Sequence, residues 1–150
     1  MAHVKKSILI HAPVEKVYAL ARDPNRWPTW YVGLSEPEKL TGEGEVGTVA
    51  KFSYMMAGMR FPVTIEVLED YVGPEGARWK GKIGGPLAGE HTWTYTPKDG
   101  DTEVAADLEY TVPGAALGRI ANRLIIERMQ ERSAEQTLEN LKLLCEEGAG

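Results

Sequence analysis

Hydrophobic and polar residues alternate with a period of two through much of the first two thirds of the chain. The first such segment covers residues 4–11, where Ile8 and Ile10 alternate with less apolar neighbours, and this pattern is typical of a β-strand. Residues 35–41 contain Pro37 and predict a weaker edge strand. Segments rich in Val, Ile, Thr, Tyr and Trp follow at residues 48–56, 61–70, 77–83, 89–97 and 102–112. Short connections rich in Gly, Pro and Asp separate them, which favours antiparallel neighbours.

Two short helices are predicted directly after the first strand. Pro13 suits the first position of a helix, where no amide proton is needed. Apolar residues then recur at helical spacing at Val14, Val17, Tyr18 and Ala21. Asp23 and Pro24 repeat the same start signal before a second short helix that carries Trp27 and Trp30.

The alternation also predicts which side chains face inward. Between residues 89 and 97 the threonines occupy one side of the strand, so His91, Trp93 and Tyr95 share the other. The same rule applied to every strand places a largely aromatic set on the concave face: Phe52, Tyr54, Trp79, His91, Trp93, Tyr95 and Tyr110. A sheet face this rich in aromatic side chains must be covered by another element.

The last third of the chain, after Pro113 and Gly114, has a helical pattern to about Cys145 and is the expected cover. Its apolar residues form two stripes on different sides: Leu117, Ile120, Ala121, Leu124 and Ile125 in the first half, and Ala134, Leu138, Leu141 and Cys145 in the second. One straight helix cannot turn both stripes to the same sheet. We therefore expect the helix to bend, break or change its contact surface between Ile125 and Met129.

Small residues on the second half of this helix face large ones on the sheet. We expect a cavity between the sheet aromatics and Met129, Ser133 and Thr137. The alternative is a well-packed core without a cavity, because small residues opposite large ones can also pack closely. Trp30 is expected to line this cavity as well. The alternative is that it packs in the core and anchors its short helix. The stripe from Leu117 to Ile125 either meets a membrane or a partner protein, or packs against a loop.

Composition narrows the class of protein. The 150 residues fit a single domain over 1–150, and the net charge of −5 without a basic patch argues against nucleic-acid binding. Cys145 is the only cysteine, so neither an intrachain disulfide nor a cysteine metal cluster is expected. No signal peptide or integral membrane segment is predicted, and a reducing cytoplasm is the simplest location.

The chain contains no convincing catalytic motif. The glycines at 42, 44 and 47 formally satisfy G-x-G-x-x-G, but this run precedes a strand and carries two glutamates, so it predicts a turn rather than a nucleotide site. His3, His11 and His91 are too scattered for a metal site, and we expect neither a metal nor a cofactor. His91, with Tyr110, is a candidate for proton transfer. The alternative is that His91 is a hydrogen-bonded structural residue in the wall of the cavity.

The ordered set of segments resembles a known family along the whole chain. IHAPVEKVY at residues 10–18, DPNRWPTW at 23–30, WTYTP at 93–97 and TLENLK at 137–142 are similar to the polyketide cyclase/dehydrase and lipid-transport superfamily. This superfamily includes START lipid-binding domains and the birch pollen allergen. The resemblance implies an α+β helix-grip fold: seven curved antiparallel strands, two short helices after the first strand, and a C-terminal helix over a cavity. It implies no shared catalytic set.

Three functions remain open. The first is a binding or carrier protein for a small apolar or aromatic ligand, which the aromatic concave face favours. The second is a cyclase or dehydratase that uses His91 and Tyr110 for proton transfer. The third is a membrane-associated or protein-interaction module that uses residues 117–125.

Overall fold

The computed structural model describes residues 1–120 and 122–147, and it places seven strands in one antiparallel sheet. Along the chain the elements are β1 (Ala2–Ile10), α1 (Val14–Ala21), α2 (Trp27–Trp30), β2 (Lys39–Thr41), β3 (Val49–Met56), β4 (Met59–Gly73), β5 (Gly76–Gly84), β6 (Gly89–Lys98), β7 (Asp101–Tyr110), α3 (Gly114–Arg119) and α4 (Arg123–Glu147). This confirms the predicted order, with α3 as an additional helix.

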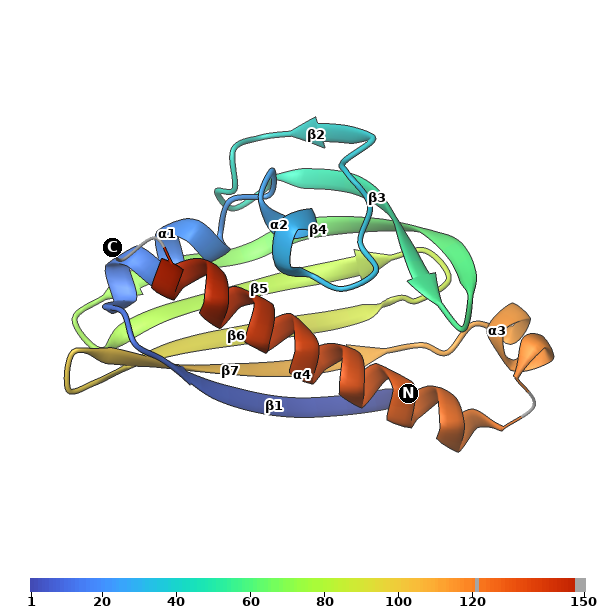
Figure 1. Ribbon diagram of the computed structural model, residues 1–150. Helices are drawn as coiled ribbons and strands as arrows, with labels where there is room; N and C mark the ends of the chain where they lie inside the picture. The colour runs from blue at the N-terminus through green and yellow to red at the C-terminus, as the bar shows by residue number, and fades with distance from the viewer. Residues whose placement is uncertain (121, 148–150) are drawn as a thin grey trace.

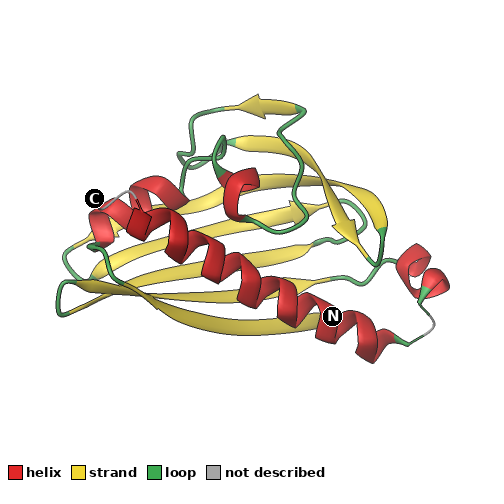
Figure 2. Ribbon diagram, viewed as in Figure 1, coloured by secondary structure: helices red, strands yellow, loops and turns green. Residues whose placement is uncertain are grey.

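The sheet is curved, and its strands follow the order β1-β7-β6-β5-β4-β3-β2. Helix α4 runs across the concave face, α1 and α2 lie toward its C-terminal end, and α3 lies beyond the opposite end of the sheet (Figures 1 and 2). This arrangement is the helix-grip fold that the sequence predicts. The sheet and α4 therefore form two layers with the core between them.

The predicted inward faces of the strands are confirmed. Trp79, Trp93 and Tyr110 are all buried, whereas Glu66 and Glu103 on the other face of the sheet are exposed. Cross-strand register places Trp79 opposite Trp93. Because the side-chain period of a strand is two, this register brings aromatic residues of neighbouring strands onto the same face.

The C-terminal helical region is broken, but at an earlier point than predicted. Helix α3 ends at Arg119 and α4 begins at Arg123 and continues without interruption to Glu147, so the break does not fall between Ile125 and Met129. The Asn122 side chain accepts a hydrogen bond from the Leu124 backbone amide at 2.9 Å. Asn122 thus caps the helix start and lets α4 take a new direction.

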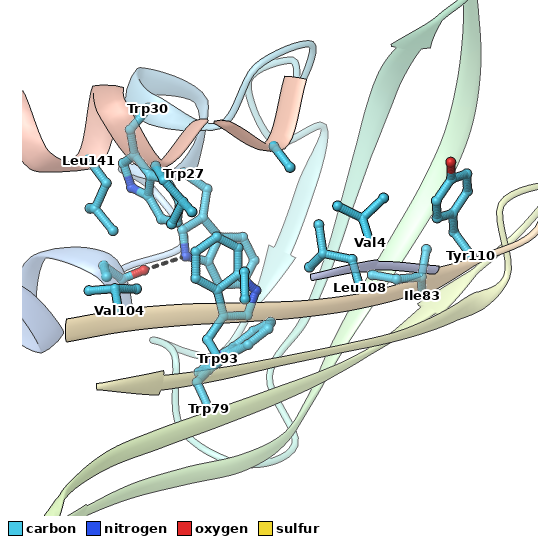
Figure 3. Packing of buried hydrophobic residues seen from close by; sticks show 14 of the residues in the cluster. Val4, Trp27, Trp30, Trp79, Ile83, Trp93, Val104, Leu108, Tyr110 and Leu141 are labelled. Carbon is cyan, nitrogen blue, oxygen red and sulfur yellow. Dashed lines mark hydrogen bonds between the residues drawn. The ribbon is translucent and has the colours of Figure 1, made fainter. Parts of the chain in front are cut away.

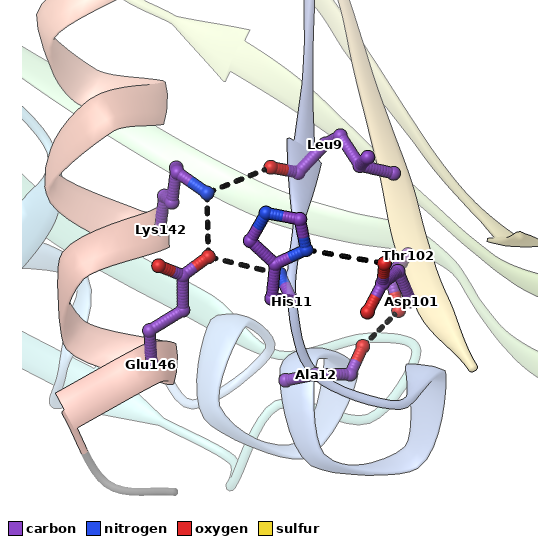
Figure 4. A network of polar contacts seen from close by, with 7 residues as sticks. All are labelled: Leu9, His11, Ala12, Asp101, Thr102, Lys142 and Glu146. Atoms are coloured by element: carbon purple, nitrogen blue, oxygen red, sulfur yellow. Dashed lines mark hydrogen bonds and ion pairs between the residues drawn. The ribbon is translucent and has the colours of Figure 1, made fainter. Parts of the chain in front are cut away.

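Polar contacts hold the far end of α4 against the sheet (Figure 4). Glu146 accepts a hydrogen bond from the His11 backbone amide at 2.9 Å, and Lys142 donates to the Leu9 carbonyl at 3.1 Å. Lys142 and Glu146 are also paired with each other, at 2.5 Å. These contacts tie the last turns of α4 to the end of β1.

Helix α1 is held to the sheet by a partly buried ion pair. Arg22 donates to both carboxylate oxygens of Asp70, at 3.0 and 2.7 Å, and the Tyr18 hydroxyl donates to the same carboxylate at 2.6 Å. The Arg22 guanidinium holds the pKa of the Asp70 carboxyl below its ordinary value. The bidentate geometry fixes the orientation of α1 on β4.

Candidate functional site

An apolar cavity of about 80 Å³ lies between the concave face of the sheet and the two elements that cover it, α2 and α4. The space is larger than one water molecule needs, but smaller than the 150 Å³ apolar cavity that is known to bind benzene. Its wall consists of Val4, Ala21, Trp27, Trp30, Tyr31, Leu34, Tyr54, Val63, Ile65, Trp79, Ile83, Leu87, His91, Trp93, Tyr95, Ala106, Leu108, Tyr110, Gln130, Ser133, Ala134 and Thr137.

All four tryptophans of the chain line this cavity, and they pack in pairs (Figure 3). Trp30 meets Trp93 edge-to-face with 5.6 Å between ring centres, and Trp27 meets Trp79 in the same way at 5.5 Å. The Trp27 indole also donates to the Ala21 carbonyl at 2.8 Å. The short helix α2 therefore lays its two tryptophans on the two tryptophans of the sheet.

The cavity extends along the sheet away from the tryptophans. Val4, Leu108, Ile83 and Tyr110 stand on the same face further along the strands (Figure 3). Tyr110 lies four residues beyond Ala106 on β7, and Ala106 is the register partner of Trp93. At about 3.4 Å per strand residue, Tyr110 is about 14 Å along the sheet from the tryptophans.

Three hydrogen bonds join α4 to the segments on the other side of the cavity. Gln130 donates to the Tyr54 hydroxyl at 2.8 Å. Thr137 accepts from the Val32 backbone amide at 3.1 Å, and Asn140 donates to the Trp30 carbonyl at 3.2 Å. These bonds connect α4 to β3 and to the chain around α2, and so they close the cavity on the helix side.

His91 and Tyr31 form the polar pair of the cavity wall. His91 Nδ1 lies 3.5 Å from the Tyr31 hydroxyl oxygen. Burial lowers the pKa of His91 to about 4, so its imidazole is neutral at pH 7. Burial raises the pKa of Tyr31, whose hydroxyl stays protonated. The sequence predicted Tyr110 as the second proton-transfer candidate beside His91, but the hydroxyl next to Nδ1 belongs to Tyr31.

Three buried donors among the described residues have no hydrogen-bond partner. They are Trp30 Nε1, Trp79 Nε1 and the Tyr110 hydroxyl, and all three residues line the cavity. Native proteins leave few buried polar groups unpaired, because each costs about 1–3 kcal/mol. Their concentration around one cavity distinguishes this wall from an ordinary core.

Most of the residues that the sequence predicts for the site do line the cavity: Trp30, Tyr54, Trp79, His91, Trp93, Tyr95, Tyr110, Ser133 and Thr137. Two do not. Phe52 is fully buried but packs against Trp27 outside the cavity wall, and Met129 is 39% exposed on the outer side of α4. The expected cavity boundary at Met129 is therefore wrong, and its place is taken by Gln130.

Sequence reasoning missed several wall residues. Tyr31 directly follows a predicted tryptophan and could have been found as part of the same apolar run. Gln130 is one residue from Met129, and a shift of 100° around the helix decides which of the two faces inward. Leu87 lies in the turn between β5 and β6, where no periodic pattern predicts burial.

Among residues 1–120 and 122–147, no Asp, Glu, Lys or Arg belongs to the cavity wall. Among the described residues, no group of three His, Cys, Asp or Glu side chains could hold a metal ion, and no helix is long and apolar enough to cross a membrane. Within the stripe at residues 117–125, Leu124 and Ile125 are 53% and 46% exposed and Leu117 and Ile120 are partly buried, while Ala121 lies outside the described residues.

The curved sheet, the gripping helix and the apolar space between them define a helix-grip domain. The sequence model of the family described as polyketide cyclase/dehydrase and lipid transport matches residues 1–146, and the chain belongs to this family. No curated protein matches the sequence.

Solved structures of low sequence identity share the fold over nearly the whole chain. TTHA0849 from Thermus thermophilus has a TM-score of 0.81 at 20% identity, covering 99% of both chains. The Zhui aromatase/cyclase from a Streptomyces species has a TM-score of 0.73 at 16% identity, covering 99% of this chain and 95% of that chain. A START superfamily protein from Mycobacterium smegmatis has a TM-score of 0.64 at 17% identity, covering 99% and 97%.

Proposed function

We propose that this protein binds or carries a small hydrophobic or aromatic molecule in the cavity between the sheet and α4. The observation that supports this most is the composition of the cavity wall, where four tryptophans and four tyrosines surround a space without any charged side chain. Ligand pockets typically combine such apolar walls with a few polar groups. Membership of a family whose description includes lipid transport agrees with the proposal.

A bound molecule the size of benzene or larger requires the cavity to widen, because its present volume is about 80 Å³. A ligand of about twenty heavy atoms that gains about 0.3 kcal/mol per atom binds with about 6 kcal/mol. This corresponds to a dissociation constant of about 40 μM for a non-cognate probe. Such an affinity is easily measured in a fluorescence titration.

The test is tryptophan fluorescence with a panel of fatty acids, flavonoids and aromatic polyketides. Because all four tryptophans line the cavity, a ligand that enters it changes their emission. Ser133→Phe places a ring in the cavity and should abolish binding at a stability cost of about 1–3 kcal/mol. Glu103→Gln, on the outer face of the sheet, is the matched control and should bind normally. A flat titration for every probe, together with a Ser133→Phe protein more stable than its parent, would refute the proposal.

A second candidate function is proton transfer on the bound molecule, as in a cyclase or dehydratase. The neighbourhood of His91 and Tyr31 supports it: a neutral imidazole can accept a proton, and a protonated phenol can donate one. Its test is to compare binding with turnover of a bound polyketide-like compound in His91→Gln and Tyr31→Phe. An enzyme loses turnover and keeps binding, whereas a carrier shows no turnover to lose.

A further inference from the structure

The unpartnered donors of the cavity wall carry information about the ligand. Trp30, Trp79 and Tyr110 are 4%, 8% and 5% exposed, and none of their side-chain polar atoms has a hydrogen-bond partner among the described residues. Trp27 lies beside them in the same wall, yet its indole is paired with the Ala21 carbonyl. An unpaired donor in this wall is therefore not a general consequence of burying tryptophan here.

An indole nitrogen can donate a hydrogen bond but cannot accept one, so the partner of Trp30 or Trp79 must be an acceptor. The Tyr110 hydroxyl can do both. Because Tyr110 is about 14 Å along the sheet from the tryptophans, one small polar group cannot serve both ends of the cavity. The wall between them includes the apolar residues Val4, Ile83 and Leu108, and also His91, which is the register partner of Leu108.

A charged ligand is disfavoured by the same wall. Its residues include no Lys or Arg that could pair with a carboxylate, and no Asp or Glu that could pair with an amine. Burying an unpaired charge costs several kcal/mol after relaxation. His91 is neutral at pH 7 because burial lowers its pKa to about 4, so the wall has no positive charge from this residue.

We propose that the cavity binds an uncharged, elongated apolar molecule with a hydrogen-bond-accepting oxygen at the tryptophan end and a second oxygen at the Tyr110 end. Carbonyl, ether and phenol groups all meet this requirement, whereas a fatty-acid carboxylate does not. This inference rests on the proposed binding function and specifies its ligand class. Entry of such a molecule widens the cavity and gives the buried donors the partners that the protein itself does not supply.

Four probes on one frame test the inference: trans-stilbene, 4-methoxystilbene, 4,4′-dimethoxystilbene and stilbene-4,4′-dicarboxylate. The dimethoxy compound should bind at least about tenfold more tightly than stilbene, because two unpaired donors gain acceptors. The dicarboxylate should bind at least about tenfold more weakly than stilbene. Trp30→Phe and Trp79→Phe should lower this preference for the ether oxygens more than they lower the affinity for stilbene itself.

Tyr110→Phe removes only the hydroxyl and gives the sharpest variant. It should lower the affinity for the dimethoxy compound more than the affinity for stilbene, and reduce the advantage of the dimethoxy over the monomethoxy compound to about onefold. Its melting temperature should be equal to or above that of the parent, because an unpaired buried group is removed. Tyr18→Phe is the matched control, since the Tyr18 hydroxyl donates to Asp70, and it should melt about 2–4 °C lower.

The possible failures are distinguishable. Equal affinity for stilbene and dimethoxystilbene, or tight binding of the dicarboxylate, overturns the ligand class and leaves the proposed binding function intact. A Tyr110→Phe protein that loses as much stability as Tyr18→Phe shows that the hydroxyl already has a partner, and it also overturns the ligand class. If none of the four probes binds, the proposed function and the inference fall together.

Discussion

The phenol ring of Tyr31 lies parallel to the imidazole ring of His91, with 9° between the ring planes and 6.3 Å between the ring centres. Both side chains belong to the cavity wall. The stack brings together a residue that follows α2 and a residue on β6, which are sixty positions apart in the chain. Because Tyr31 and the cavity wall shield the imidazole from water, protonation of His91 opposes folding.

Stability should therefore decrease as the pH falls from about 6.5 to about 4. In this range the unfolded chain protonates His91, with its ordinary pKa of 6.5, while the folded protein protonates it only near pH 4. One proton corresponds to a slope of at most about 1.4 kcal/mol per pH unit. His91→Gln should remove this component, which urea titrations of both proteins between pH 4 and 7 can measure. Parallel stability curves for the two proteins would contradict the prediction.

Asp70 should control stability at lower pH. The Arg22 guanidinium lowers the pKa of this carboxyl, so its contribution is present above the unfolded pKa and is lost as the pH falls through the folded one. Asp70→Asn leaves Arg22 without a charged partner and should cost about 1–3 kcal/mol at pH 7. As the pH falls through the lowered pKa of the folded protein, the variant and the parent should converge. A constant difference in unfolding free energy down to pH 2 would show that the ion pair is not the cause.

Two adjacent isoleucines at the start of α4 should behave very differently. Ile126 is fully buried, whereas Ile125 is 46% exposed. Ile126→Ala should cost about 2–5 kcal/mol because it opens space in the core. Ile125→Ala should change stability by less than about 0.5 kcal/mol. Chemical denaturation of the two variants compares them directly, and similar losses would mean that α4 does not turn Ile126 rather than Ile125 toward the core.

The same exposed surface is the place to test the hypothesis that residues 117–125 contact a membrane. Leu124 and Ile125 are exposed, and Arg128 and Arg132 follow on the same outer side of α4. If this surface binds anionic lipid, the parent protein should sediment with anionic vesicles and not with neutral ones. The double variant Leu124→Ser, Ile125→Ser should then stay in the supernatant. Equal sedimentation of both proteins would exclude this surface as the contact.

Asn122 should stabilise the start of α4 as its N-terminal cap. Its side chain accepts a hydrogen bond from the Leu124 amide, which is one of the amides without a partner inside the helix. Asn122→Ala should lower the unfolding free energy by about 1 kcal/mol, and Asn122→Asp or Asn122→Ser should restore most of it. Thermal denaturation monitored by circular dichroism measures the effect. A loss that Asp and Ser do not restore would point to a cause other than the cap.

The sequence predicted the fold well because the fold depends on short-range periodicity. Alternation in each strand decides which side chains share a face, so Trp79, Trp93 and Tyr110 could be placed inward without a structure. Proline and aspartate signals predicted that two short helices follow β1, but not where they begin. Pro13 is the N-cap of α1 rather than its first residue, and α2 begins at Trp27 rather than directly after Pro24. The change of stripe in the last third predicted a break between Ile125 and Met129, but the helix breaks within the first stripe, between Arg119 and Arg123.

The site was predicted less completely, since periodicity gives the side of an element but not its distance from the cavity. Phe52 and Tyr54 both face inward on β3, yet only Tyr54 reaches the cavity wall. On α4, the choice between Met129 and Gln130 depends on how the helix is rotated, and the burial of residues such as Ile126 and Ala134 sets that rotation.

By itself, the sequence determined that seven strands and a C-terminal helix would enclose an aromatic core. Only the tertiary structure decided that three donors of that core lack partners in the part of the chain that the structure describes, and that Tyr31 rather than Tyr110 lies next to His91. The physical reason is that hydrogen bonding between distant segments depends on the distance and angle between particular atoms. Those distances are set by how α2 and α4 pack on the sheet, and no local pattern in the chain records them.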